Sequence, residues 1–145
     1  MAYWLFTEAI LAGRPIKLFD HGRMQRDFTY IDDVVEAVVR LIDRPAAGNP
    51  NWSGMQPDPA SSAAPWRIYN IGNNEAVELL EFVEVIEQAL GKKAKREMLP
   101  MQPGDAPATY ADVDDLMREV GFRPSTPIKL GIERFIAWYR DYHRV

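Results

Sequence analysis

The sequence contains no cysteine and only two histidines among its 145 residues. Without cysteine there is no disulfide framework, no thiolate catalysis and no zinc–cysteine site. A reducing compartment fits this composition, and we expect the cytoplasm. His21 lies in a predicted turn and His143 near the end of the chain. Solvated histidines are commoner than general bases at such positions, so neither is given a catalytic role.

Positive charge is not in surplus, and long apolar runs are missing. The formal net charge is -4, with a pI near 5.2. This balance argues against a general affinity for nucleic acid or anionic membranes, so any polyanion must be held by a local site. No stretch approaches the roughly 18 to 20 apolar residues that cross a bilayer. An apolar helical pattern begins at the first residue without an N-cap, which we interpret as a cut edge.

The usual sequence motifs of catalysis are also lacking. There is no G-x-G-x-x-G, no P-loop, and no Ser/His/Asp arrangement that the spacing supports. The glutamates of residues 77–90 alternate with an apolar face and are interpreted as solvated, not as a metal site. We therefore do not expect the chain to be a self-contained enzyme.

What is present is enough hydrophobic content, 47%, to build a core for one domain. Periodicity and turn residues predict helices, strands and loops in the order α, β, β, α, β, α, β, α, α. The predicted helices cover residues 2–13, 34–44, 77–90, 113–121 and the segment after Pro127; the predicted strands cover 16–19, 28–31, 66–71 and 92–99. Such alternation predicts an α/β or α+β fold.

Turn and capping residues predict further local features. The first two strands are expected to form a hairpin around Asp20-His21-Gly22. Asp32 or Asp33 is expected to cap the next helix, and Asp112 a later one. Gly91 should end the helix of residues 77–90. The buried face of the last helix should consist of Leu130, Ile132, Phe135, Ile136 and Trp138.

Residues 46–65 read AAGNPNWSGMQPDPASSAAP and have no apolar period. Their Pro, Gly, Ser and Ala content predicts a flexible surface insertion or lid. We expect function to lie elsewhere.

A few side chains suit an anionic ligand that carries an aromatic ring. The planar guanidinium of Arg26 could meet two phosphate oxygens, although a salt bridge to Asp27 or Asp33 is the commoner arrangement. Phe19 could stack on a base or lie in the core. Asp105 could accept hydrogen bonds from ribose hydroxyls or cap a turn. From the residues alone these alternatives stay open.

Three motifs recur in a fixed order: G-x-x-x-RDFTYIDD at residues 22–33, YNIGN at 69–73 and LPMQPGDAPATYAD at 99–112. In this order they resemble the C-terminal part of the extended short-chain dehydrogenase/reductase superfamily. Within it, the sequence is similar to the NAD-dependent nucleotide-sugar epimerases, and most similar to UDP-glucuronate 4-epimerases. The resemblance covers nearly all of residues 1–145, with only 46–65 lacking a clear counterpart.

The resemblance implies roles for five residues in holding a UDP-sugar. Arg26 matches the arginine that contacts the diphosphate, and Phe28 the aromatic position two residues on. Phe19, with the backbone around Lys17 and Leu18, matches the edge that receives the uracil, and Asp105 the acidic residue near the ribose. Gln102 stands where galactose-type epimerases have a second arginine, so the two-arginine clamp is incomplete.

The resemblance also implies what residues 1–145 lack. In that family an N-terminal Rossmann half binds NAD and supplies the Tyr-x-x-x-Lys pair, so we expect this chain alone to be inactive. Removal of that half should expose apolar surface, and we expect self-association, as a homo-oligomer, through it. Two alternatives are a dehydratase or reductase of the same superfamily and a non-catalytic binding module derived from it. Arg23 has no counterpart and is interpreted as a solvated turn residue.

Overall fold

The computed structural model describes residues 1–145, which form two compact units. Unit 1 comprises Met1–Phe28, Glu75–Tyr110 and Thr126–Val145; unit 2 comprises Thr29–Asn74 and Ala111–Ser125. No helix is both long and apolar enough to cross a membrane.

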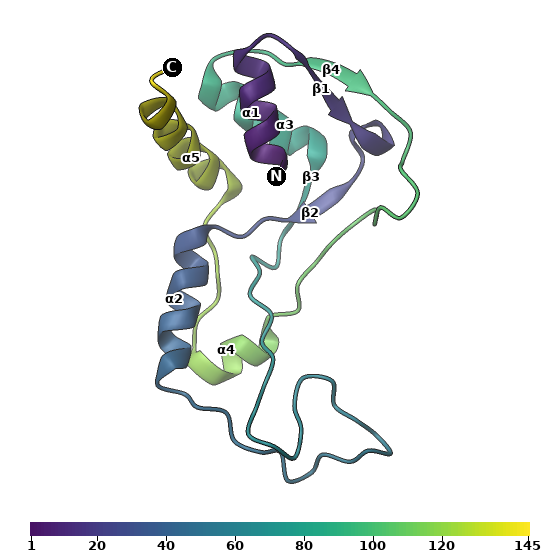
Figure 1. Cartoon of the computed structure of the whole chain (residues 1–145), viewed down its shortest axis with the longest axis vertical. Coiled ribbons are helices and arrows are strands. Elements are labelled where there is room, and N and C mark those ends of the chain that lie inside the picture. The colour runs from purple at the N-terminus through teal and green to yellow at the C-terminus, as the bar shows by residue number, and fades with distance from the viewer. The chain divides into compact units, whose positions relative to one another are not determined.

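Helices and strands follow one another in the predicted succession, but two of the four strands lie at residues other than those predicted (Figure 1). The elements are α1 (Ala2–Leu11), β1 (Pro15–Leu18), β2 (Gln25–Asp27), α2 (Ile31–Ile42), β3 (Ala76–Glu78), α3 (Leu79–Leu90), β4 (Lys95–Met98), α4 (Asp114–Val120) and α5 (Ile128–His143), with a 3₁₀ turn, η1 (Phe19–Gly22), after β1.

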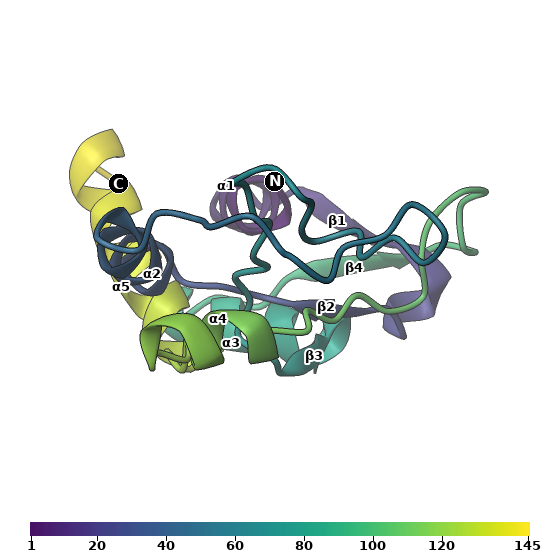
Figure 2. The same cartoon turned by 90° about the horizontal axis from the view of Figure 1, so that it is seen from below.

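Unit 1 holds two short sheets. β1 pairs with β4 in parallel, with Leu18 opposite Met98, and Figures 1 and 2 both show these two strands side by side. β2 pairs with β3 antiparallel, with Arg26 opposite Val77. The predicted hairpin between the first two strands is therefore wrong. Asp20 and His21 in the connecting turn have left-handed backbone angles, with φ of 47° and 52°, and the chain leaves the turn toward β3 instead of folding back on β1.

The core of unit 1 lies between helices α1, α3 and α5 and the sheets. Its most deeply buried side chains are Ile10, Ile16, Leu18, Phe82, Val83 and Ile86. α3 presents one apolar face to this core and ends at Gly91, which adopts the left-handed conformation (φ 66°) predicted for a C-terminal glycine. The predicted last strand is confirmed as β4.

The structure corrects the predicted face of α5. Ile132 and Ile136 are buried as expected, but Leu130 and Trp138 are partly exposed, and Tyr139 takes the third buried position. Trp138 instead stacks on Tyr142, with ring centroids 5.3 Å apart. Phe135, one turn before Tyr139, is half-buried, and the centroids of the two rings lie 5.8 Å apart.

Two predicted strands are not formed. Residues 28–31 fail because Ile31 already belongs to α2, which begins three residues earlier than expected. Residues 66–71 remain irregular apart from an isolated bridge between Ser61 and Arg67. Unit 2 contains no other strand that could pair with them, and an extended segment without a partner has no ladder of hydrogen bonds.

In unit 2, α2 packs against α4, and Arg40 of α2 lies over the ring of Phe122 at 4.8 Å. Neither Asp32 nor Asp33 is the N-cap of α2, because Tyr30 holds that position and both aspartates lie in the first turn. A carboxylate oxygen of Asp33 accepts the backbone N–H of Ser125 instead. Asp112 accepts the N–H of Asp114, the first residue of α4, but Val113 holds the N-cap position, so Asp112 lies one residue before the predicted cap.

Candidate functional site

The ends of β1 and β2 are both tied to the 99–109 segment, which carries the third motif. Leu99 donates its backbone N–H to the carbonyl of Leu18 and accepts from the N–H of His21, both at 2.9 Å. Gln25 donates to the carbonyl of Pro107 at 2.9 Å and accepts from the N–H of Thr109 at 3.2 Å. The structure therefore brings two of the three motifs together within unit 1.

Arg26 lies where this segment crosses β2. Its Nη1 donates to the carbonyl oxygens of Gln25 (2.7 Å) and Ala106 (2.9 Å), and its Nη2 lies 3.4 Å from the sulfur of Met24. The guanidinium forms no ion pair, so the commoner salt bridge to Asp27 or Asp33 is absent. Since a guanidinium has five N–H groups, one on Nη2 and the one on Nε keep their capacity to donate.

The Gln102–Asp105 turn directly precedes Ala106, whose carbonyl accepts the hydrogen bond from Arg26. The N–H of Asp105 donates to the carbonyl of Gln102 at 3.2 Å, with Pro103 and Gly104 in the central positions. Gly104 has a φ of 89°, which favours glycine. Gln102 is exposed and Asp105 half-buried.

The two phenylalanines of the predicted site are both attached to the core. Phe28 stacks on Phe82 of α3, with ring centroids 4.4 Å apart and an interplanar angle of 17°. Phe19, the first residue of η1, is half-buried and packs against the same core. Phe28 therefore fixes the backbone that follows Arg26.

Steric crowding explains why glycine occupies the first position of the first motif. Gly22 has a φ of 82°, and a Cβ at this position would lie 2.7 Å from the side chain of Leu80. Only glycine meets both conditions without displacement of the Leu80 side chain. Arg23, the next residue, bonds Asp20 at 2.8 Å and is mostly exposed, in agreement with its interpretation as a surface turn residue.

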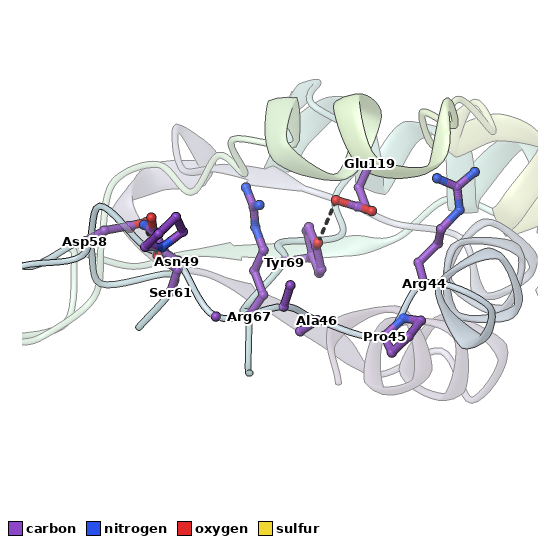
Figure 3. Close-up of a pocket in the computed structure, with 12 residues that line it drawn as sticks. Arg44, Pro45, Ala46, Asn49, Asp58, Ser61, Arg67, Tyr69 and Glu119 are labelled. Atoms are coloured by element: carbon purple, nitrogen blue, oxygen red, sulfur yellow. Dashed lines mark hydrogen bonds between the residues drawn. The ribbon is translucent and has the colours of Figure 1, made fainter. Parts of the chain in front are cut away.

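Sequence reasoning missed a cavity in unit 2. It measures about 420 Å³ and is lined by Arg44, Pro45, Ala46, Ala47, Gly48, Asn49, Pro50, Asp58, Ser61, Arg67, Tyr69 and Glu119 (Figure 3). Seven of these residues belong to the 46–65 segment, where no function was expected. The only signal in the sequence was the spacing of Arg67 and Tyr69, which share one side of an extended chain.

Two tyrosine and arginine contacts organise this cavity. The Tyr69 hydroxyl donates to Glu119 at 3.1 Å. The pKa of the tyrosine is raised mainly by its burial and, to a lesser extent, by this hydrogen bond. Arg67 pairs with Asp115 at 3.2 Å, which raises the pKa of the arginine and lowers that of the aspartate.

The residues present do not fit a dinucleotide. Pyrophosphate is usually held at a helix N-terminus that follows a glycine-rich turn. Here α2 follows Thr29-Tyr30 and carries Asp32 and Asp33 in its first turn, where they would repel a phosphate.

Comparison with known proteins agrees with the class that the motifs suggested. Residues 3–72 match the model of the NAD dependent epimerase/dehydratase family. The chain is 52% identical to protein CapI of Staphylococcus aureus over 99% of its own length and 43% of that protein. It is 46% identical to the probable UDP-glucuronate 4-epimerase of Rhizobium meliloti, again over 99% of its own length and 42% of that protein.

Among solved structures, it resembles the UDP-glucuronic acid 4-epimerase of Bacillus cereus in complex with UDP-glucuronic acid and NAD. The TM-score is 0.77 at 23% identity, and the match covers 98% of this chain and 40% of that one. The fold is thus a mixed α/β piece of the Rossmann-type epimerase fold.

Residues 3–72 thus match the NAD dependent epimerase/dehydratase family model, and the chain as a whole is similar to part of protein CapI and of a probable UDP-glucuronate 4-epimerase. It spans about two fifths of the length of the curated relatives that it matches.

Proposed function

We propose that this chain is the nucleotide-sugar-binding, C-terminal portion of an NAD-dependent nucleotide-sugar epimerase that acts on UDP-glucuronate. One observation carries the proposal: the Arg26 guanidinium makes no ion pair and keeps two N–H donors at the junction of β2 and the 99–109 segment. A buried or half-buried arginine without a carboxylate partner is suited to an anionic ligand.

In this proposal Arg26 binds the diphosphate and the neighbouring residues bind the nucleoside. Phe19 and the backbone of Lys17 and Leu18 receive the uracil. Asp105 accepts hydrogen bonds from the ribose hydroxyls, and Gln102 donates one neutral hydrogen bond. Phe28 contributes through its stack on Phe82, which holds the strand that carries Arg26.

The part played by this chain is to hold the diphosphate while the hexose turns. A fixed diphosphate lets the sugar present either face to the reacting groups, which is what inversion at one carbon requires. The hydride acceptor and the proton acceptor are assigned to the remainder of the longer protein. NAD belongs to that remainder as well, and the proposal keeps the cytoplasm as the location.

Relatives support the epimerase over the alternatives. The named relatives include a probable UDP-glucuronate 4-epimerase of Rhizobium meliloti and UDP-glucuronate 4-epimerase 2 of Arabidopsis thaliana. A dTDP-glucose 4,6-dehydratase of Bacillus anthracis shares the fold, so dehydration remains the second candidate. A glutamate near the reacting carbon in the longer protein would favour dehydration, and a full-length chain that binds UDP without any turnover would favour the binding module.

Calorimetric titration of the 145-residue chain tests the proposal. UDP should bind saturably, and uridine should bind at least tenfold more weakly because it lacks the groups that Arg26 recognises. Equal binding of UDP and uridine, or no saturable heat with UDP, would remove the diphosphate role. The same protein incubated with UDP-glucuronate and NAD should form no UDP-galacturonate on chromatography, and turnover would show that the reacting groups are present after all.

A further inference from the structure

The cavity of unit 2 is not used by the proposed nucleotide site, with which it shares no residue. Figure 3 shows Arg44 and Glu119 at one end, Asp58, Asn49 and Ser61 at the other, and Arg67 and Tyr69 between them. Its volume of about 420 Å³ falls within the range of small-molecule sites.

One end of the cavity is built by hydrogen bonds within the 46–65 segment. Ser61, which is 6% exposed, donates to Asp58 at 2.6 Å and accepts from the Asn49 side chain at 3.0 Å. The hydrogen bond from Ser61 and a second one from the backbone N–H of Ala60 lower the pKa of Asp58. The backbone N–H of Asn49 also donates to the carbonyl of Ser62 at 2.8 Å.

A glycine lets the two sides of the 46–65 segment approach each other. A Cβ on Gly48 would lie 2.3 Å from the carbonyl oxygen of Ala63, so any larger residue would separate the two sides. The cavity wall is therefore specified by the sequence of residues 46–65.

Some charged groups of the cavity have partners within the chain and one does not. Arg67 is paired with Asp115 and lies over the Tyr69 ring at 5.3 Å, so its charge is already in use. Glu119 accepts the Tyr69 hydroxyl through one oxygen, Oε2. Arg44 forms neither an ion pair nor a side-chain hydrogen bond, and its guanidinium is the uncommitted cation of the cavity.

The unpaired guanidinium of Arg44 and the neighbouring carboxylates indicate which class of ligand the cavity can bind. An uncommitted guanidinium binds a carboxylate or a phosphate in bidentate fashion. The carboxylates of Asp58 and Glu119 repel a dianion such as phosphate, but they accept hydrogen bonds from hydroxyl groups. A single carboxylate on a hydroxylated ring satisfies both conditions.

We propose that this cavity binds a sugar acid of monosaccharide size, such as a hexuronate. Its carboxylate lies on Arg44 and its hydroxyls on Glu119 at the same end of the cavity, while Asp58, Ser61 and Asn49 close the other end. This site goes beyond the nucleotide-binding role and does not depend on it.

Two-dimensional ¹⁵N NMR titration of the whole chain with sodium glucuronate tests the site. Saturable shifts are expected for the amides of Asn49, Ser61 and Tyr69. Arg44→Gln should weaken binding by about tenfold or more, the effect of one lost hydrogen bond to a charged group. Arg44 is exposed and unpaired, so this variant should keep the wild-type spectrum elsewhere. Arg14→Gln, an exposed arginine of unit 1, is the charge-matched control and should bind like the wild type.

Glucose and inorganic phosphate at equal ionic strength define the ligand class. Both should bind at least tenfold more weakly than glucuronate. Glucose binding as tight as glucuronate would contradict the role of Arg44, and phosphate binding as tight would contradict the hydroxyl contacts. The absence of saturable shifts in residues 44–69 with glucuronate, or unchanged binding by Arg44→Gln, would overturn the site.

Discussion

Nη1 of Arg26 lies 2.9 Å from the carbonyl oxygen of Ala106, eighty residues further along the chain. This bond joins the first and third motifs, and it links the segment that follows the Gln102–Asp105 turn to a guanidinium that makes no ion pair. A ligand phosphate would add to these contacts through the remaining N–H groups of the guanidinium.

Replacement of Arg26 by alanine should weaken UDP binding by about 1.5 to 3 kcal/mol, the range for hydrogen bonds to charged groups. Arg23→Ala is the matched control, since Arg23 is three residues away, is 71% exposed and bonds only Asp20. Calorimetric measurement of the UDP affinity of both variants distinguishes the contribution of Arg26 from that of Arg23. Equal losses would point to a general charge effect, and no loss in Arg26→Ala would take this residue out of the site.

Replacement of Gly22 by alanine should destabilise unit 1 by about 2 to 4 kcal/mol. The new Cβ adds left-handed backbone strain and overlaps the Leu80 side chain at 2.7 Å. Gly54→Ala is the control, because no atom lies within 4 Å of its Cβ position, and its effect should stay within about 0.5 kcal/mol. Urea unfolding measures both; similar midpoints for the two variants would refute the steric explanation.

Glu87 should make unit 1 less stable at acid pH. Burial alone would raise the pKa of this carboxyl, but hydrogen bonds from Lys93, the Ala94 N–H and Arg96 lower it below its ordinary value of 4.5. Because the pKa of Glu87 is lower in the folded chain than in the unfolded chain, the ionised carboxylate stabilises the fold. This stabilisation is complete at pH values above the unfolded-state pKa and is lost as the pH falls through the folded-state pKa. The free energy of unfolding should therefore decrease as the pH is lowered below about 4.5.

Variants of two glutamates isolate this effect. Glu87→Gln should cost about 1.5 to 3 kcal/mol at neutral pH and flatten the acid dependence. Glu84→Gln removes a half-exposed carboxylate 4.0 Å from Arg96 and should cost less than about 1 kcal/mol. An acid profile that is unchanged in Glu87→Gln would assign the pH dependence to other groups.

The isolated chain should self-associate through α2. Ile31, Val35, Val38 and Ile42 follow a helical period of one face, and each is between 48% and 72% exposed. An exposed apolar stripe of this kind finds a partner, which in a solution of this chain is a second copy. Sedimentation velocity should show a coefficient that rises with protein concentration.

The double variant Val35→Lys and Val38→Lys should sediment as a monomer, whereas Met55→Lys, at a loop position that is 91% exposed, should behave like the wild type. A wild-type chain that stays monomeric at every concentration and binds no apolar dye would contradict the association.

Local patterns predicted most of the elements, because their signals are short in range. The apolar face of α3 and the glycine that ends it are both contained in fifteen residues, and all five predicted helices formed. The β1–β4 pairing was missed because it joins Leu18 to Met98, and no local signal encodes a register over that separation. The run Phe28 to Ile31 is too short to tell a strand from a helix start.

The candidate site was predicted in part. Motif order placed Arg26 and residues 102–105 in one group, and the structure brings the two segments into contact through Ala106. The binding roles of Phe19, Arg26, Phe28, Gln102 and Asp105 stay predictions. The cavity of unit 2 could not be predicted, because its lining comes from segments between Arg44 and Glu119 whose approach depends on a glycine and on side-chain hydrogen bonds.

Mapping of UDP on the ¹⁵N NMR spectrum of the chain tests the central claim most directly, because it reports the position of the ligand as well as its affinity. We predict saturable shifts confined to residues 17–28 and 99–109, which disappear at the same UDP concentration in Arg26→Ala and persist in Arg23→Ala. Shifts that fall outside these two segments, or that are unchanged in Arg26→Ala, would contradict the assignment of this chain as the part that holds the nucleotide diphosphate.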